Sequence, residues 1–193
     1  MASSAETSPS LFAAACIPKV FVWCNSQHPH RFRPEHYEGL GTVVSFTSTT
    51  KLRAPFFARE PIVRDTIRIM QEHAVLRGVQ IATYCFMPDH MHIEVGASDN
   101  CGALQFINEI KGLSARASWS HGVHRTIWQR SYWDVIVEPG LDGIRAAMAY
   151  TLCNSEDAGL VKKWTDYPWC GSLVYTREEL IEIVPPGVNA GRS

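Results

Sequence analysis

The sequence lacks the features that mark membrane proteins, disulfide-rich secreted domains and repeat proteins. No apolar run approaches the ~20 residues that a membrane-spanning helix needs. Six cysteines are scattered without a Cys-x-x-Cys pair, and several lie in apolar stretches, which favours reduced thiols over a disulfide framework. The chain contains no internal repeat and no low-complexity tract. We therefore expect a cytoplasmic globular protein of 193 residues, without membrane association and built around one domain.

An excess of basic residues is also missing, although nucleic-acid-binding proteins usually carry one. The formal net charge is −1 at pH 7. Residues 19–77 hold nine Lys and Arg against five Asp and Glu, whereas residues 142–193 hold five against seven. Any positive surface should therefore come mainly from the first half of the chain. Any one charged side chain, taken alone, is best explained as part of the solvated surface.

The pattern of apolar residues predicts an α+β domain. The predicted strands are 42–47, 79–86, 90–96 and 127–137, and the predicted helices are 61–77, 101–119 and 142–153. This βαββαβα order predicts a ferredoxin-like two-layer domain, with an antiparallel sheet and helices mainly on one face. We expect a loosely ordered leader over residues 1–38, the domain over 39–175, and a C-terminal tail over 176–193.

The most informative stretch is residues 87–95, which follows a buried strand. Its Pro88-Asp89 pair breaks that strand with turn chemistry. The alternation that follows places His90, His92 and Glu94 on one face of a new strand. Two imidazoles roughly 6–7 Å apart along that face have about the spacing that two ligands of one cation need. Two solvated histidines explain the pair equally well, because a lone His-x-His is a weak signal.

The last predicted helix carries a second pair of polar side chains. Tyr150 and Asn154 are four residues apart and therefore project from the same side of a helix. Taken singly, Tyr150 is explained by packing with its hydroxyl at the rim, and Asn154 by the end of a helix.

Six segments, taken in order, resemble a known family. They are Tyr84-Cys85-Phe86-Met87-Pro88-Asp89-His90-Met91-His92, Lys111-Gly112-Leu113-Ser114-Ala115-Arg116, Trp128-Gln129-Arg130-Ser131-Tyr132, Tyr150-Thr151-Leu152-Cys153-Asn154, Ala158-Gly159-Leu160-Val161 and Asp166-Tyr167-Pro168-Trp169. In order and approximate spacing, over about residues 40–175, the chain resembles the single-tyrosine HUH transposases and, within them, the REP-associated tyrosine transposases.

The resemblance implies a metal-dependent nickase and strand transferase that cleaves hairpin-bearing single-stranded DNA through a 5′-phosphotyrosine. It implies that His90, His92 and Asn154 bind the metal ion and that Tyr150 is the nucleophile. A tyrosine hydroxyl is a poor nucleophile at neutral pH and needs a cation or base beside it. The family is usually described as using Mg or Mn, although two imidazoles and an amide suit Mn, Co or Zn better than Mg by ligand softness.

The implied partner is single-stranded or hairpin DNA. The residues expected to contact phosphates are Lys111, Arg116, Arg125 and Arg130, with Arg53 as a further candidate. Trp128 and Tyr132 are candidates for stacking on unpaired bases, whereas Trp133 is expected in the core. The wider group forms dimers that exchange tyrosine helices and the REP-associated branch acts as monomers, so monomer and homodimer both stay open.

This chain also departs from the family pattern. Asn154-Ser155-Glu156-Asp157 stands where the family commonly has Asn-Pro and a basic residue, and the tail after residue 176 is acidic. We expect these carboxylates to weaken DNA affinity by repulsion. The alternative function is therefore a domesticated protein of the same fold that binds a DNA hairpin without cutting it.

The sequence also suggests two zinc sites. A zinc deaminase, suggested by His92-Ile93-Glu94, is rejected because the chain lacks the Pro-Cys-x-x-Cys segment that such enzymes need. A structural zinc site formed by Cys85, His90, His92 and Cys101 stays open, although its spacing is not a standard one.

Overall fold

The computed structural model describes residues 41–187, and the leader expected over residues 1–38 lies outside this range. The strands are β1 (Val43–Thr49), β2 (Gln80–Met87), β3 (His90–Gly96), β4 (Trp133–Ile136) and β5 (Cys170–Gly171). The helices are α1 (Glu60–Arg77), α2 (Ala103–Ala117), α3 (Leu141–Asp157) and α4 (Arg177–Ile183). Short 3-10 helices lie at η2 (Lys51–Arg53), η3 (Phe56–Ala58), η4 (Ser118–His121) and η5 (Trp164–Asp166).

The five strands form one antiparallel sheet in the order β4-β1-β3-β2-β5. β3 is its central strand, paired with β1 on one side and β2 on the other. The tight turn between β2 and β3 sets this pairing, and the longer α1 and α2 segments return the chain to the sheet. The α+β class and the ferredoxin-like order of elements are thereby confirmed.

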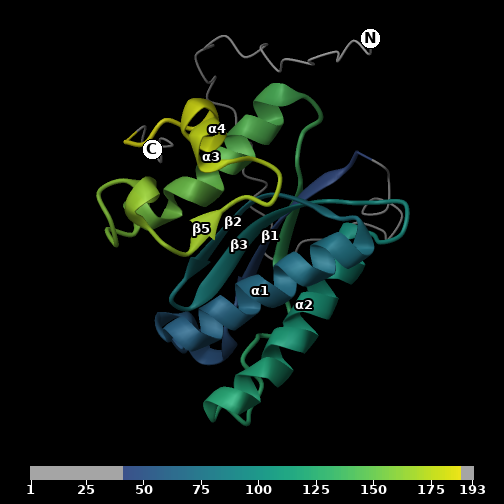
Figure 1. Ribbon diagram of the computed structural model, residues 1–193, viewed down its shortest axis with the longest axis vertical. Helices are drawn as coiled ribbons and strands as arrows, with labels where there is room; N and C mark the ends of the chain where they lie inside the picture. Colours follow the sequence, from purple (N-terminus) through teal and green to yellow (C-terminus); the bar gives the residue numbers. More distant parts are fainter. Residues whose placement is uncertain (1–40, 188–193) are drawn as a thin grey trace, which may run out of the picture.

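The two faces of the sheet carry separate hydrophobic clusters. Met91 and Ile93 of β3 point toward α1 and α2, and their cluster includes Ile62 of α1 and Ile107 of α2. On the opposite face, β2 and α3 share a second cluster with the segment from η5 to α4. Figure 1 shows α1 and α2 together on one side of the sheet and α3 with α4 on the other. Since side chains alternate along a strand, each residue of β3 faces either α1 and α2 or α3. Helices thus cover both faces of the sheet and not mainly one, as was expected, because β2 presents the apolar side chains Cys85 and Met87 to α3.

Two segments differ from the sequence-based expectation. The strand predicted over 127–137 is only four residues long, because the pairing with β1 is interrupted at residues 130–132; Trp128 and Gln129 still bond to Thr50 and Thr49 at the end of β1. Residues expected in the C-terminal tail form α4, which Thr176 caps with a capping box and which buries Leu180 in the second cluster. Across residues 41–187, no helix has the length and apolar character that crossing a membrane requires.

Candidate active site

β3 presents two imidazoles on the sheet face that α3 covers. The rings of His90 and His92 lie 4.8 Å apart between centroids and are nearly perpendicular, at 80°. His92 is buried at 3% exposure, and His90 is partly exposed at the end of the strand. The alternation predicted from the sequence therefore brings both rings to one place, with one side of the pair open toward solvent.

Each imidazole is oriented by a hydrogen bond at Nδ1. His90 Nδ1 lies 2.5 Å from the Asp89 carboxylate, which also accepts a bond from Arg53 Nη1 at 3.1 Å. His92 Nδ1 lies 3.0 Å from Thr47 Oγ1. Partners of this kind fix the tautomer and the ring orientation of metal-binding histidines, so Nε2 is the atom through which each ring would bind a cation.

The sequence alone does not mark Asp89 and Thr47 as residues that orient the imidazoles. Burial alone would raise the pKa of Asp89, but the hydrogen bonds and charges of His90 and Arg53 lower it below its usual value, which keeps the carboxylate ionised beside His90. The adjacency of Asp89 to His90 in the turn was a usable signal. Thr47 could be identified only from the strand register, which pairs it with His92.

The phenol of Tyr150 reaches the same place from α3. Its ring centroid lies 5.4 Å from that of His92, at an interplanar angle of 89°. Tyr150 is partly exposed, while its neighbours Ala149 and Thr151 are buried. The structure thus brings Tyr150 and the His pair together from two elements of one chain.

Asn154 lies one helical turn beyond Tyr150 and is 6% exposed. Its Nδ2 donates to the Tyr150 carbonyl at 2.5 Å, so the amide nitrogen is used inside the helix. Metal ions bind the oxygen of an amide, and this bond leaves that role to Oδ1. Asn154 therefore lies on the Tyr150 side of α3, and its Nδ2 bond is made within the helix.

A buried carboxylate ties α3 to the sheet next to the His pair. Glu94 shares the strand face of His92 and is 1% exposed. It accepts hydrogen bonds from Ser45 of β1 and Thr83 of β2, and from Thr151 of α3 at 2.5 Å. Burial raises the pKa of Glu94 to about 7, against the opposing effect of these hydroxyls. The sequence placed Glu94 on this face but did not indicate its partners, which come from three other elements.

The residues predicted to bind DNA divide into two sets. Arg116, Arg125 and Arg130 are exposed and available to a ligand. Arg125 packs its guanidinium over the Phe56 ring, at 5.2 Å from the centroid. Arg116 lies apart from them on α2, in a hollow that also contains Glu109.

The other three predicted DNA-binding residues are held in the fold. Trp128 is 4% exposed and its Nε1 donates to Ser114 Oγ, so its ring is not a platform for bases, contrary to expectation. Lys111 is also buried, and its Nζ lies 4.9 Å from the ring centroid of Tyr132. Tyr132 packs edge-on against Phe46. Trp133, expected in the core, is instead 40% exposed on β4, because the alternation of this short strand buries Asp134.

The structural zinc hypothesis fails on geometry. Within residues 41–187, no group of three or more His, Cys, Asp or Glu residues is arranged to hold a metal ion. Cys101 belongs to the cluster on the α1 and α2 face, whereas Cys85 packs in the cluster beneath α3. The two thiols therefore lie on opposite faces of the sheet and do not form one site with the His pair.

A family model and two solved structures match this chain. The family model described as "Transposase IS200 like" matches residues 42–140, which include the His pair and end just before α3. A solved REP-associated tyrosine transposase bound to a REP hairpin has a TM-score of 0.57 and 22% sequence identity, covering 72% of this chain and 81% of that chain. A protein of Deinococcus radiodurans R1 assigned as a transposase, solved at 1.90 Å, has a TM-score of 0.43 and 22% identity, covering 50% of this chain and 78% of that one.

None of the curated proteins matches the chain at a significant level. The structural likeness to the hairpin-bound transposase supports the same α+β fold. The family model matches more than half of the sequence. The chain therefore belongs to the IS200-like transposase family.

Proposed function

We propose that this chain is a metal-dependent single-stranded DNA endonuclease and strand transferase, acting on hairpin-bearing DNA through a 5′-phosphotyrosine. The observation that carries the proposal is the contact of the Tyr150 ring with the His92 ring, which in turn lies against the His90 ring. The solved relative of the same fold is bound to a REP hairpin, which supports a DNA hairpin as the substrate.

Tyr150 acts as the nucleophile in this proposal. Its hydroxyl oxygen forms a bond to the scissile phosphorus while the bond from phosphorus to the 3′ oxygen breaks. The phenol loses its proton and the leaving 3′ oxygen gains one, so the products are a 5′-phosphotyrosine and a free 3′ hydroxyl. Attack by another 3′ hydroxyl reverses the exchange and rejoins strands, and it needs no nucleotide cofactor because one phosphodiester replaces another.

The residues that would hold a divalent ion are His90, His92 and Asn154. The residues present fit such an ion, because both Nδ1 atoms are already engaged by Asp89 and Thr47 and each Nε2 is the ligating position. When bound, the ion would withdraw charge from the non-bridging oxygens of the phosphate. The imidazoles and the amide suit Mn as well as Mg, and the choice of ion is left to the experiment.

The carboxylates after Asn154 favour the non-cleaving alternative, because they would repel DNA. One of them, Glu156, is instead engaged by the fold. Glu156 accepts hydrogen bonds from the backbone N–H of Trp164 at 2.5 Å and of Gly187 at 3.4 Å. It therefore caps the segment after α3, and part of its charge is offset by these donors. Asp157 remains exposed at the end of α3.

The test is a cleavage assay on a hairpin oligonucleotide with unpaired flanks, with Mg or Mn supplied in turn. We expect a covalent protein–DNA adduct that survives denaturation and is absent in Tyr150→Phe. Tyr175→Phe is the matched control, because Tyr175 is partly exposed and lies outside the site. A hairpin that is bound but never cut with either ion would favour the non-cleaving alternative.

A further inference from the structure

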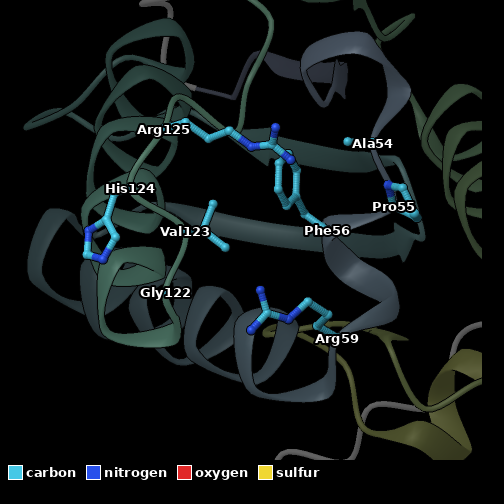
Figure 2. A pocket seen from close by; sticks show the side chains of 8 residues that line it. All are labelled: Ala54, Pro55, Phe56, Arg59, Gly122, Val123, His124 and Arg125. Atoms are coloured by element: carbon cyan, nitrogen blue, oxygen red, sulfur yellow. The ribbon is translucent and has the colours of Figure 1, made fainter.

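One hollow of the described chain lies away from the catalytic residues. It is lined by residues of 54–59 and 122–125, and has a volume of about 580 Å³. Figure 2 shows the guanidinium groups of Arg59 and Arg125 entering it from two different segments, with Phe56 and Val123 between them. We call this hollow the basic groove.

The lining of the basic groove carries charge of one sign, since it contains two arginines and no Asp or Glu. The two segments that form it and its surroundings, residues 50–59 and 121–130, contain five Lys and Arg and no Asp or Glu, in a chain whose net charge is −1. Arg59 and Arg125 are both exposed at the groove. Arg59 is held in place by a bond from Nη2 to the His121 carbonyl at 2.8 Å. Arg125 is held by its stacking on Phe56. Two fixed guanidinium groups in a lining without carboxylates form a surface suited to phosphates. The carboxylates close to the groove already have partners: Glu60 pairs with Arg64, Asp65 with His121 and Asp89 with Arg53.

The basic groove is connected to the catalytic site through the segment between β1 and α1. The backbone N–H of Phe57 donates to the Pro88 carbonyl at 3.0 Å, and Thr50 N–H donates to the Asp89 carbonyl at 2.8 Å. In the same segment, Arg53 binds the Asp89 carboxylate that orients His90. A strand leaving the His pair across this end of the sheet would therefore pass Arg53 and meet the groove.

The backbone between the two sites adopts an unusual conformation. Leu52 and Arg53 have φ of 58° and 51°, the left-handed region that residues with a side chain rarely adopt. The Leu52 side chain is 88% exposed, between the cations Lys51 and Arg53. Strained backbone of this kind concentrates at functional sites, and here it displays an apolar side chain flanked by positive charge.

The geometry points to a binding site for unpaired DNA: the basic groove holds the phosphodiester backbone of the single strand that flanks the cleaved phosphate. This inference rests on the proposed function and adds a second contact region to it. Arg59 and Arg125 bind the phosphates, and the outer plane of the Arg125 guanidinium offers a surface on which an unpaired base stacks. A base-paired flank would keep its bases in the duplex and could not use that surface.

The test compares two synthetic DNA ligands by fluorescence anisotropy without divalent ions, so that no cleavage occurs. One is the hairpin alone, and the other is the same hairpin with an unpaired extension, tested in a 5′ version and a 3′ version. We expect one version of the extended ligand to bind the wild-type chain more tightly than the hairpin alone does. The double variant Arg59→Gln with Arg125→Gln should lose that gain in affinity. Removing two single-strand phosphate contacts should reduce the salt dependence, log K against log salt concentration, by about 1.4.

The matched control is Arg64→Gln with Arg68→Gln, which also removes two exposed arginines, but from α1, where they pair with Glu60 and Glu72. It should keep the preference for the extended ligand. The proposed role of the groove would be overturned if the wild-type chain bound both ligands equally, or if both double variants lost the same affinity. A groove-dependent preference in a chain that forms no covalent adduct would support the groove and remove only the proposed cleavage.

Discussion

At the scale of single residues, the most informative contacts are those that orient the imidazoles. Asp89 binds His90 Nδ1, and a neutral hydroxyl, Thr47, binds His92 Nδ1. A carboxylate raises the basicity of the imidazole it binds more than a hydroxyl does. The contribution of Asp89 to cation binding should therefore be the larger of the two.

Asp89→Asn tests this role. It keeps the shape of the side chain and removes the charge beside His90, so affinity for Mn should fall by about 10- to 100-fold. Calorimetric titration of the purified protein measures the affinity without needing DNA or turnover. Asp65→Asn is the control, because Asp65 binds the imidazole of His121, at 2.8 Å, away from the site. Equal affinities in the wild type and Asp89→Asn would contradict the assignment.

At the scale of elements, α3 is positioned over the sheet by a buried polar contact as well as by apolar packing. The Thr151 hydroxyl donates to Glu94, and Thr151 directly follows Tyr150 in the helix. Since Glu94 also accepts from β1 and β2, one carboxylate links four elements around the candidate site.

Thr151→Val removes the α3 bond and keeps the shape of the side chain. Leaving the buried carboxylate with one donor fewer should lower the free energy of unfolding by about 1–2 kcal/mol. It should also slow adduct formation by roughly 10- to 100-fold, because small displacements of a nucleophile are costly. Urea unfolding and a single-turnover assay measure the two effects.

Thr66→Val is the control for Thr151→Val. Thr66 is equally buried, but its hydroxyl bonds only to the Ile62 carbonyl within α1. The control should leave adduct formation unchanged. If the two variants slow the reaction equally, the link through Glu94 has no part in positioning Tyr150.

An ion pair joins α1 to α2 on the other face of the sheet. Arg77 binds the Glu109 carboxylate through Nε at 3.1 Å and Nη2 at 2.7 Å. Burial would raise the pKa of Glu109, but the bonds from Gln105 and Arg77 lower it below the unfolded value. A depressed pKa means that the carboxylate stabilises the fold above the unfolded pKa and that this stability is lost as the pH falls through the folded pKa.

Glu109→Gln should therefore lower the free energy of unfolding by about 0.5 kcal/mol at pH 7, and the difference from wild type should shrink when the pH is lowered to 3. Urea unfolding at the two pH values measures it. Glu72→Gln, which breaks only a pair with Arg68 inside α1, should have a smaller effect. A deficit in Glu109→Gln that persists unchanged at pH 3 would show that charge is not its cause.

At the scale of the whole molecule, Tyr150 contacts His92 of its own chain. A mixture of Tyr150→Phe with the double variant His90→Ala and His92→Ala should therefore form no adduct, because neither chain has a complete site. The adduct is read on a denaturing gel after the two proteins are mixed and incubated. Restored activity in the mixture would mean that the tyrosine helix is exchanged between subunits.

The order of elements and the face of the His pair could be predicted from the sequence, because strand alternation is a local property. Partners from distant segments could not: Thr47 and Thr83 became neighbours of the site only through the sheet register. Trp128 illustrates the opposite error. An aromatic residue among cations suggests DNA binding, yet packing against α2 buries it.

The most direct measurement is the identification of the amino acid that carries DNA after reaction with a hairpin substrate. Protease digestion and mass spectrometry of the covalent product locate the nucleotide remnant on one peptide. We predict that the remnant lies on Tyr150. A remnant on any other residue, or no covalent product with Mg or Mn, would contradict the proposed function.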